Sequence, residues 1–215
     1  MSSRVSIMAQ TAPRRWRLFT LGILAVGVAT GVAAAQDAVF PTAKLFEALA
    51  LKPGGTACEM GAGDGELSVD AADRVGAHGH VYASEVGDNV QKLRDRIAAA
   101  NRPHIAVVAG AAERTNFPDA SCDALFMRKV YHHFDAPAVM NLSIAAALKP
   151  GGRVAIVDFG PPPGAEAANP ADRDTDGHHG ITAPTVVREL RAAGFAVIAT
   201  ETGAGRAFMV VARKS

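Results

Sequence analysis

Strand-like and helix-like runs alternate along most of this 215-residue chain, and this alternation restricts the possible fold more than any other feature. The apolar, strand-like runs lie at 56–60, 80–86, 104–110, 122–128 and 152–159, and the helical patterns lie at 65–75, 87–100 and 136–148. Strands that alternate with helices are joined by right-handed crossovers, which produce a parallel sheet with helices on both faces. The sequence therefore predicts an α/β, doubly wound, Rossmann-like fold, preceded by a short helix within 41–55.

The C-terminal part departs from this alternation. After a helical pattern over 182–195, residues 196–213 indicate two strands around a turn at Gly203-Ala204-Gly205, which is the pattern of a hairpin. One edge of the sheet is therefore expected to be antiparallel. Residues 160–180 have no periodicity and form a longer stretch than a structural connection needs, so we expect a lid or substrate loop there, with a disordered connection as the alternative.

The glycine-rich segment EMGAGDG follows the first predicted strand. In an open parallel sheet, ligands bind at the carboxyl ends of the strands where the strand order reverses. Glycine allows positive φ angles and lets a ligand approach the backbone, and here glycines occupy three alternate positions, Gly61, Gly63 and Gly65. A dinucleotide fingerprint needs a glycine where this chain has Glu66, whose carboxylate would repel a pyrophosphate. The segment therefore favours a nucleoside without phosphates, with Glu59 available for a cationic group.

The first 35 residues have the features of an export signal. They contain four arginines and no acidic residue, carry no charge from 18 to 35, and end in three alanines before Gln36. This pattern predicts a signal peptide over 1–35 and a periplasmic or secreted protein. An uncleaved inner-membrane anchor is the alternative, because the apolar run is close to the shortest that spans a bilayer.

Removal of this segment would lower the 22 basic residues to 18, against 21 acidic residues. No basic stripe with interleaved aromatic side chains remains, so we expect no nucleic-acid partner. The only membrane contact expected is through the N-terminal segment, if it is not cleaved. The sequence predicts no oligomeric state.

Cys58 and Cys122 are the two cysteines of the chain, too few for a disulfide scaffold and without the spacing of metal ligands. Each lies within an apolar strand-like run. We therefore expect two small buried core residues that carry no chemistry.

Four further features join the glycine segment: Glu85 at the end of the second predicted strand, GAAERTNFPDASCDALF, LKPGGRVAIVDF and the terminal hairpin. With them, the chain from Pro41 to Lys214 resembles class I S-adenosylmethionine-dependent methyltransferases. The resemblance implies a domain over 36–215 with a seven-stranded sheet whose last strand is antiparallel, and S-adenosylmethionine as the cofactor.

The resemblance also implies roles for individual residues. The three glycines would line the methionine and ribose portions of the cofactor, Glu59 would help orient its ammonium group, and Glu85 would accept hydrogen bonds from both ribose hydroxyls. Ala111 stands where the family usually has an aspartate that binds the adenine amino group. Ala112 can still offer a backbone N–H to the adenine ring, and Glu113 can substitute for the missing acceptor. Arg128 completes the predicted cofactor-binding set.

The segment RKVYHHFD follows the fourth predicted strand, where the family places residues around the transferred methyl. Methyl transfer is an in-line displacement, so a base is needed only when the acceptor carries a proton. Tyr131, His132 and His133 are the catalytic candidates, although one histidine of an adjacent pair commonly packs or caps a helix. Asp158, at the end of the fifth predicted strand, is also expected near the site, with a helix cap or a loop hydrogen bond as the alternative.

The predicted lid contains DRDTDGHHG, in which Asp172, Asp174 and Asp176 reproduce the first half of a calcium loop. The second half fails, because the twelfth position is Ala183 rather than glutamate. The segment thus favours a solvated acidic loop, and the sequence assigns no metal. His178 and His179 would either reach the substrate from the lid or form a transition-metal site with these aspartates.

The leading prediction is a methyltransferase that transfers a methyl group from S-adenosylmethionine to a small-molecule acceptor. An exported, non-catalytic module that binds S-adenosylmethionine or S-adenosylhomocysteine is the alternative, motivated by Ala111 and by the export signal. A nicotinamide-dependent oxidoreductase needs the glycine spacing that this chain lacks. The cofactor is made in the cytoplasm, so transport or leakage of cofactor, translation from Met8 and failed export all remain open.

Overall fold

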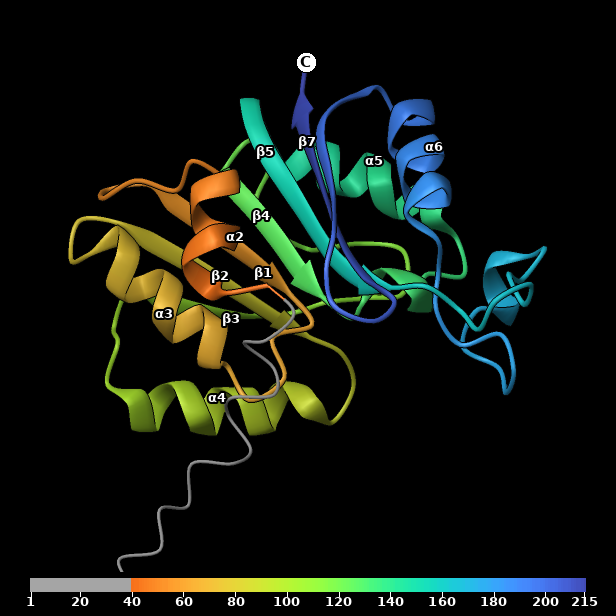
Figure 1. Cartoon of the computed structure of the whole chain (residues 1–215). Coiled ribbons are helices and arrows are strands. Elements are labelled where there is room, and N and C mark those ends of the chain that lie inside the picture. The colour runs from red at the N-terminus through yellow and green to blue at the C-terminus, as the bar shows by residue number, and fades with distance from the viewer. Residues whose placement is uncertain (1–39) are drawn as a thin grey trace, which may run out of the picture. The chain divides into compact units, whose positions relative to one another are not determined.

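The computed structural model describes residues 40–215, and the predicted signal segment 1–35 lies outside this range. Seven strands form one sheet in the order β3-β2-β1-β4-β5-β7-β6 (Figure 1). The strands are β1 (Thr56–Met60), β2 (His80–Glu85), β3 (Ile105–Ala109), β4 (Cys122–Arg128), β5 (Leu148–Phe159), β6 (Phe195–Thr202) and β7 (Ala207–Lys214). Strands β1 to β5 are parallel, and β7 runs antiparallel to both β5 and β6. The predicted doubly wound, seven-stranded fold with an antiparallel last strand is confirmed.

Helices cover both faces of the sheet, with α2, α3 and α4 on one face and α5 and α6 on the other (Figure 1). Their bounds are α2 (Thr42–Ala48), α3 (Glu66–Val75), α4 (Asn89–Ala100), α5 (Pro137–Ala147) and α6 (Ala183–Ala192), and two 3-10 turns are η1 (Tyr131–His133) and η2 (Pro170–Asp172). Successive residues of β4 point to opposite faces: Phe126 packs in the core with α2, whereas Leu125 packs in the core with α5 and α6. Because β4 is buried on both faces, its sequence is a nearly continuous apolar run.

Cys58 of β1 and Cys122 of β4 form a disulfide, with 5.9 Å between their Cα atoms. Both residues are fully buried, as expected, but the prediction that they carry no chemistry is wrong. The two cysteines are 64 residues apart in the sequence. They meet because β1 and β4 are neighbours in the sheet, with Ala57 paired to Ala124.

The strand order reverses between β1 and β4, because β2 and β3 extend the sheet on one side and β5 on the other. Such a reversal leaves room for a ligand beyond the carboxyl ends of the two central strands. The glycine segment follows β1, Glu85 ends β2, Arg128 ends β4, and Asp158 is the next-to-last residue of β5. The fold therefore brings these predicted site residues to one edge of the sheet.

The connection from β5 to α6 is irregular apart from η2, as the sequence predicted. It packs on α6, in contrast to the disordered connection considered as the alternative. Arg173 is buried and donates to both carboxylate oxygens of Glu189 on α6, at 3.3 and 2.5 Å. Thr182 and Thr185 both donate to Glu166. Within residues 40–215, no helix combines the length and the apolar character that crossing a bilayer requires.

Candidate cofactor and acceptor site

The glycine segment adopts the left-handed backbone that its sequence predicted, with φ of +65° at Gly61, +54° at Gly63 and +76° at Gly65. An added Cβ at Gly61 would lie 2.4 Å from Cγ2 of Val130, whereas one at Gly63 would meet no atom within 4 Å. At Gly65 it would lie 2.9 Å from Cδ1 of Ile97. Packing inside the protein therefore opposes a side chain most strongly at 61, since the Ile97 methyl near 65 ends a flexible side chain that can shift. Backbone conformation favours glycine at all three positions.

Glu85 connects the glycine segment to the end of β2. Its Oε1 accepts a hydrogen bond from the Gly63 N–H at 2.8 Å, and its Oε2 accepts one from the Val86 N–H at 3.1 Å. Each carboxylate oxygen has further acceptor capacity beyond these bonds. Glu85 can thus hold the loop and accept from a pair of hydroxyl groups at the same time.

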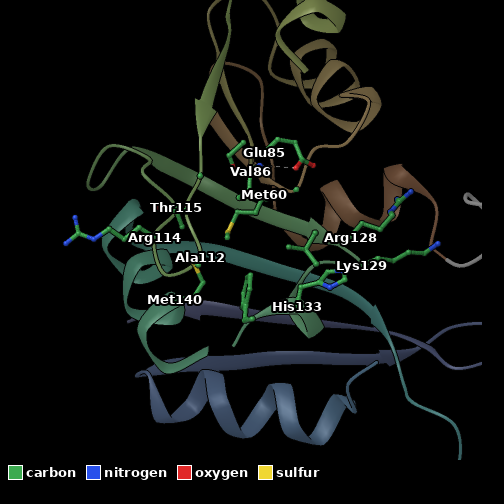
Figure 2. Close-up of a pocket in the computed structure, with 16 residues that line it drawn as sticks. Met60, Glu85, Val86, Ala112, Arg114, Thr115, Arg128, Lys129, His133 and Met140 are labelled. Atoms are coloured by element: carbon green, nitrogen blue, oxygen red, sulfur yellow. Dashed lines mark hydrogen bonds between the residues drawn. The ribbon is translucent and has the colours of Figure 1, made fainter. Parts of the chain in front are cut away.

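A cavity of about 490 Å³ lies against the glycine segment and the ends of β2 and β4. In Figure 2, Glu85 and Val86 lie on the opposite side of this cavity from Met140 and His133. Four of the predicted cofactor-binding residues line it: Gly61, Glu85, Ala112 and Arg128. Ala111, at the position of the missing aspartate, also lines it. We call it the cofactor cavity below.

The other predicted cofactor-binding residues lie elsewhere. Gly63 and Gly65 belong to the same loop but do not line the cofactor cavity, and Glu113 faces a separate hollow beside Phe117. Glu59 is 3% exposed and lies behind the loop, where the Ser68 hydroxyl of α3 donates to its carboxylate. Burial raises the pKa of Glu59 to about 8, and the bond from Ser68 and the charge of Arg128 oppose that increase.

A second cavity of about 480 Å³ adjoins this region, and Arg128 and Lys129 line both cavities. Its other wall residues include Phe40, Phe159 and Arg206, with the Arg206 guanidinium 5.9 Å from the centre of the Phe159 ring. We call it the acceptor cavity. Sequence reasoning missed Lys129, whose positive φ of +58° at the end of β4 has no signal in the sequence.

Three of the four predicted catalytic residues lie at or between the two cavities. His133 lines the cofactor cavity and Asp158 lines the acceptor cavity. His132 is buried between them, where its Nδ1 lies 2.8 Å from Oδ1 of Asp158, and its backbone N–H donates to Oδ2 of the same carboxylate. Asp158 also accepts from the N–H of Phe159, so the loop hydrogen bond weighed for it is present.

Tyr131 lies apart from the other candidates. Its side chain is fully buried, and its hydroxyl accepts a bond of 2.7 Å from the Asn141 amide. Burial raises its pKa far above the ordinary value. Tyr131 lines neither the cofactor cavity nor the acceptor cavity.

The sequence from 58 to 156 matches the family model described as "Methyltransferase domain". Residues 58–156 therefore belong to a methyltransferase domain. Over 123 residues the chain is 31% identical to the ubiquinone/menaquinone biosynthesis C-methyltransferase of Ectopseudomonas mendocina, a match that covers 54% of this chain and 46% of that protein. It is 32% identical over 111 residues to a 2-phytyl-1,4-naphtoquinone methyltransferase of Trichormus variabilis, covering 50% of this chain and 48% of that protein. The matches thus span about half the length of these curated relatives.

The methyltransferase fold extends beyond the matched segment. The crystal structure of a SAM-dependent methyltransferase from Aquifex aeolicus superposes with a TM-score of 0.71 at 21% identity, covering 84% of this chain and 93% of that one. At this identity the likeness establishes the fold alone.

The cofactor of this family is S-adenosylmethionine, and the residues present fit it. The cofactor cavity has the volume of a small-ligand site. Glu85 presents two acceptor oxygens for a ribose diol. Within residues 40–215, Nε of Arg128 is a buried donor without a hydrogen-bond partner, which suits the carboxylate of a methionine group. When bound, the cofactor supplies an electrophilic methyl group.

Proposed function

We propose that this protein transfers a methyl group from S-adenosylmethionine to a small-molecule acceptor. The observation that carries the proposal is the adjacency of the cofactor and acceptor cavities, which share Arg128 and Lys129 as wall residues. A nucleophile in the acceptor cavity would lie next to the methionine end of a cofactor held by Glu85 and Arg128. Holding both reactants in line supplies much of the acceleration of such a displacement.

The protein's own residues serve mainly to bind and orient. Glu85 and the glycine segment hold the ribose end, and Arg128 holds the carboxylate end. If the acceptor carries a proton, His133 is the predicted base, because it is the histidine of the predicted pair that lines the cofactor cavity. His132 is held by Asp158 and lies behind His133.

Quinone-like aromatic compounds are the first acceptor class to test. The relatives named above are a ubiquinone/menaquinone biosynthesis C-methyltransferase and a 2-phytyl-1,4-naphtoquinone methyltransferase. The acceptor cavity supports the same class, because the aromatic side chains of Phe40 and Phe159 line it and its volume of about 480 Å³ admits a small ring system.

One observation favours a second candidate, a module that binds the cofactor without catalysis. Ala111 lines the cofactor cavity at the position where the family usually supplies an aspartate to the adenine. The loss of that acceptor lowers the expected affinity for the cofactor. The missing aspartate affects only the binding of the cofactor and leaves the acceptor cavity unchanged, so catalysis remains the leading proposal.

Calorimetric titration with S-adenosylmethionine, S-adenosylhomocysteine and NAD tests the cofactor. We expect both sulfur nucleosides to bind and NAD not to bind. Glu85→Ala should weaken S-adenosylmethionine by about 1.5–3 kcal/mol, because it removes charge-assisted hydrogen bonds to the ribose. Glu113→Ala is the matched control, since Glu113 does not line the cofactor cavity. Equal losses in both variants, or no binding of either sulfur nucleoside, would contradict the proposed cofactor site.

Catalysis is tested separately with methyl-labelled S-adenosylmethionine and a panel of hydroquinones, catechols and small thiols. Transfer of label to at least one small molecule is the expected result. Tight cofactor binding with no transfer to any member of the panel would favour the non-catalytic module.

We also propose that the protein is exported, either released or held by an N-terminal anchor. Three features of the first 35 residues support export: arginines without any acidic residue, an uncharged run, and small residues before Gln36. The Cys58–Cys122 disulfide gives independent support, because disulfides persist mainly in oxidising compartments.

A further inference from the structure

Three histidines and two aspartates meet beside the acceptor cavity. His132 and His133 come from η1, Asp158 from the end of β5, and Asp174 and His179 from the connection between β5 and α6. The ring of His179 packs edge-on against His132 and Phe159, at 4.9 and 5.1 Å between ring centres. His179 and Asp158 also line the acceptor cavity, so the cluster lies where an acceptor would bind.

Asp158 determines which atom His132 presents to the cluster. The carboxylate lies 2.8 Å from Nδ1 of His132 and accepts from its backbone N–H as well. A carboxylate at this position favours the tautomer in which Nδ1 donates to Asp158, and that tautomer has a lone pair on Nε2. The His132 side chain is 1% exposed, and its Nε2 is directed at His179. A carboxylate behind an imidazole is the usual second partner of a metal-bound histidine.

Two potential ligand atoms lie opposite that lone pair. Nε2 of His179 lies 3.1 Å from Nε2 of His132 and 3.3 Å from Oδ1 of Asp174. Nδ1 of His133 lies 3.1 Å from the other oxygen of Asp174 and so orients the carboxylate. If Nε2 of His179 carries the hydrogen, this single N–H cannot donate well to both His132 and Asp174. If Nδ1 of His179 carries it instead, the lone pairs on Nε2 of His179 and Nε2 of His132 face each other.

A cation between these atoms resolves the conflict. Zinc bonds of about 2.0–2.2 Å in a tetrahedron place neighbouring ligand atoms about 3.3–3.6 Å apart. The two separations of 3.1 and 3.3 Å are close to that edge length, and all three atoms lie within 4.8 Å of one another. Asp174 and His179 are more than half exposed, so a cation can reach them from solvent.

We propose that His132 Nε2, His179 Nε2 and Asp174 Oδ1 bind a divalent transition-metal ion, with zinc the best fit to two imidazoles and one carboxylate. Asp158 and His133 position the ligands. Calcium and magnesium are disfavoured because they require mainly oxygen ligands. The half-formed calcium loop does not assemble either: Asp172 bonds to Asn169, and among residues 40–215 the cluster that includes Asp174 contains neither Asp172 nor Asp176.

Three protein ligands leave at least one coordination position for water or for an acceptor atom. Since His179 lines the acceptor cavity, the ion would contact that cavity directly. The inference concerns metal binding and does not depend on methyl transfer, because the ion can be measured without cofactor or acceptor.

The experiment uses untagged full-length protein, stripped with a chelator and dialysed. Zinc affinity is measured by competition with a chromogenic chelator, and the visible spectrum of the cobalt-loaded protein reports the coordination geometry. We expect one equivalent to bind and to give the intense d–d bands of a four-coordinate site. Loss of an outer partner of a ligand costs about 10–100-fold in affinity, so His179→Ala and Asp174→Asn should each cost at least that much.

The matched controls are His178→Ala and Asp176→Asn, which alter the neighbouring residues outside the cluster. His178 bonds instead to the Ala165 carbonyl. Both controls should keep the wild-type affinity and cobalt spectrum. Absence of saturable zinc binding by the wild-type protein would overturn the proposal. So would a His179→Ala protein that binds zinc as tightly as the wild type, or controls that lose affinity as much as the ligand variants.

Discussion

Gly61 and Gly63 share a left-handed backbone but differ in what surrounds them. An alanine at either position adopts positive φ at a cost of about 1–2 kcal/mol. Gly61→Ala also places its Cβ 2.4 Å from Val130, whereas Gly63→Ala meets no protein atom within 4 Å. We therefore expect Gly61→Ala to lower the free energy of unfolding more than Gly63→Ala, as measured by urea denaturation.

Val130→Ala should recover part of the loss in the Gly61→Ala background, because it removes the methyl groups that clash. If Gly61→Ala and Gly63→Ala lower the free energy of unfolding equally, and Val130→Ala restores none of it, then backbone conformation alone causes the loss of stability. At Gly63 an added Cβ meets no protein atom within 4 Å, but the Gly63 N–H donates to Oε1 of Glu85, the predicted ribose acceptor. Gly63→Val strains the left-handed backbone that holds this bond, so it should weaken S-adenosylmethionine about tenfold or more, which is about 1.4 kcal/mol.

Glu59 makes the stability of the protein depend on pH. Its pKa is about 8 in the folded protein, against an ordinary value of 4.5, because burial disfavours the charged form. The folded state therefore holds a proton that the unfolded state releases above pH 4.5. The stabilising contribution is complete below pH 4.5 and is lost as the pH rises through 8. We expect the free energy of unfolding to fall between pH 5 and pH 8 for this reason.

The measurement is the difference in unfolding free energy between wild type and Glu59→Gln across that pH range. Glutamine cannot ionise, so the wild type should lose stability relative to this variant as the pH rises. Glu47→Gln, an exposed site on α2, is the control and should show no such trend. A wild type that gains stability relative to Glu59→Gln with rising pH would reverse the sign and refute the buried, protonated carboxyl.

At the scale of elements, the disulfide joins the two strands on either side of the reversal. Linking residues 64 positions apart removes chain entropy from the unfolded state worth about 4 kcal/mol. The double variant Cys58→Ala/Cys122→Ala should therefore lose about 2–4 kcal/mol of unfolding free energy in urea. A reductant should destabilise the wild type and leave the double variant unchanged. Equal stability of wild type and double variant would show that the cysteines are not joined.

Several elements follow from local pattern, and others depend on their neighbours. Strand β4 begins and ends at the predicted residues, because its apolar run is nearly continuous. Strand β5 begins at Leu148, four residues before the prediction. The sheet pairs Leu148 with Cys122 and then Arg153 with Ala124, so β5 bulges between these two pairs. The bulge accommodates the proline and glycines between Leu148 and Arg153, which do not fit the sequence pattern of a strand.

At the scale of the whole molecule, the open question is where the protein works. We expect the mature chain to begin at Gln36, since the small residues before it form a cleavage pattern. Mass spectrometry of the protein from its native host should find that terminus in the periplasmic or extracellular fraction. A chain that lacks residues 1–35 should keep the cofactor affinity of the full chain, because the described fold begins at residue 40. An intact cytoplasmic chain that starts at Met1 would contradict export.

The order of the strands and helices, the backbone of the glycine segment and the placement of Glu85 were predictable from the sequence, because periodicity and glycine spacing are local properties. The Cys58–Cys122 bond, the two cavities that share Arg128 and Lys129, and the meeting of His132 with Asp174 and His179 were decided only by the tertiary structure. Each of these joins segments far apart in the chain. Their proximity depends on the strand order at the reversal and on how the β5–α6 connection packs, neither of which has a local signal.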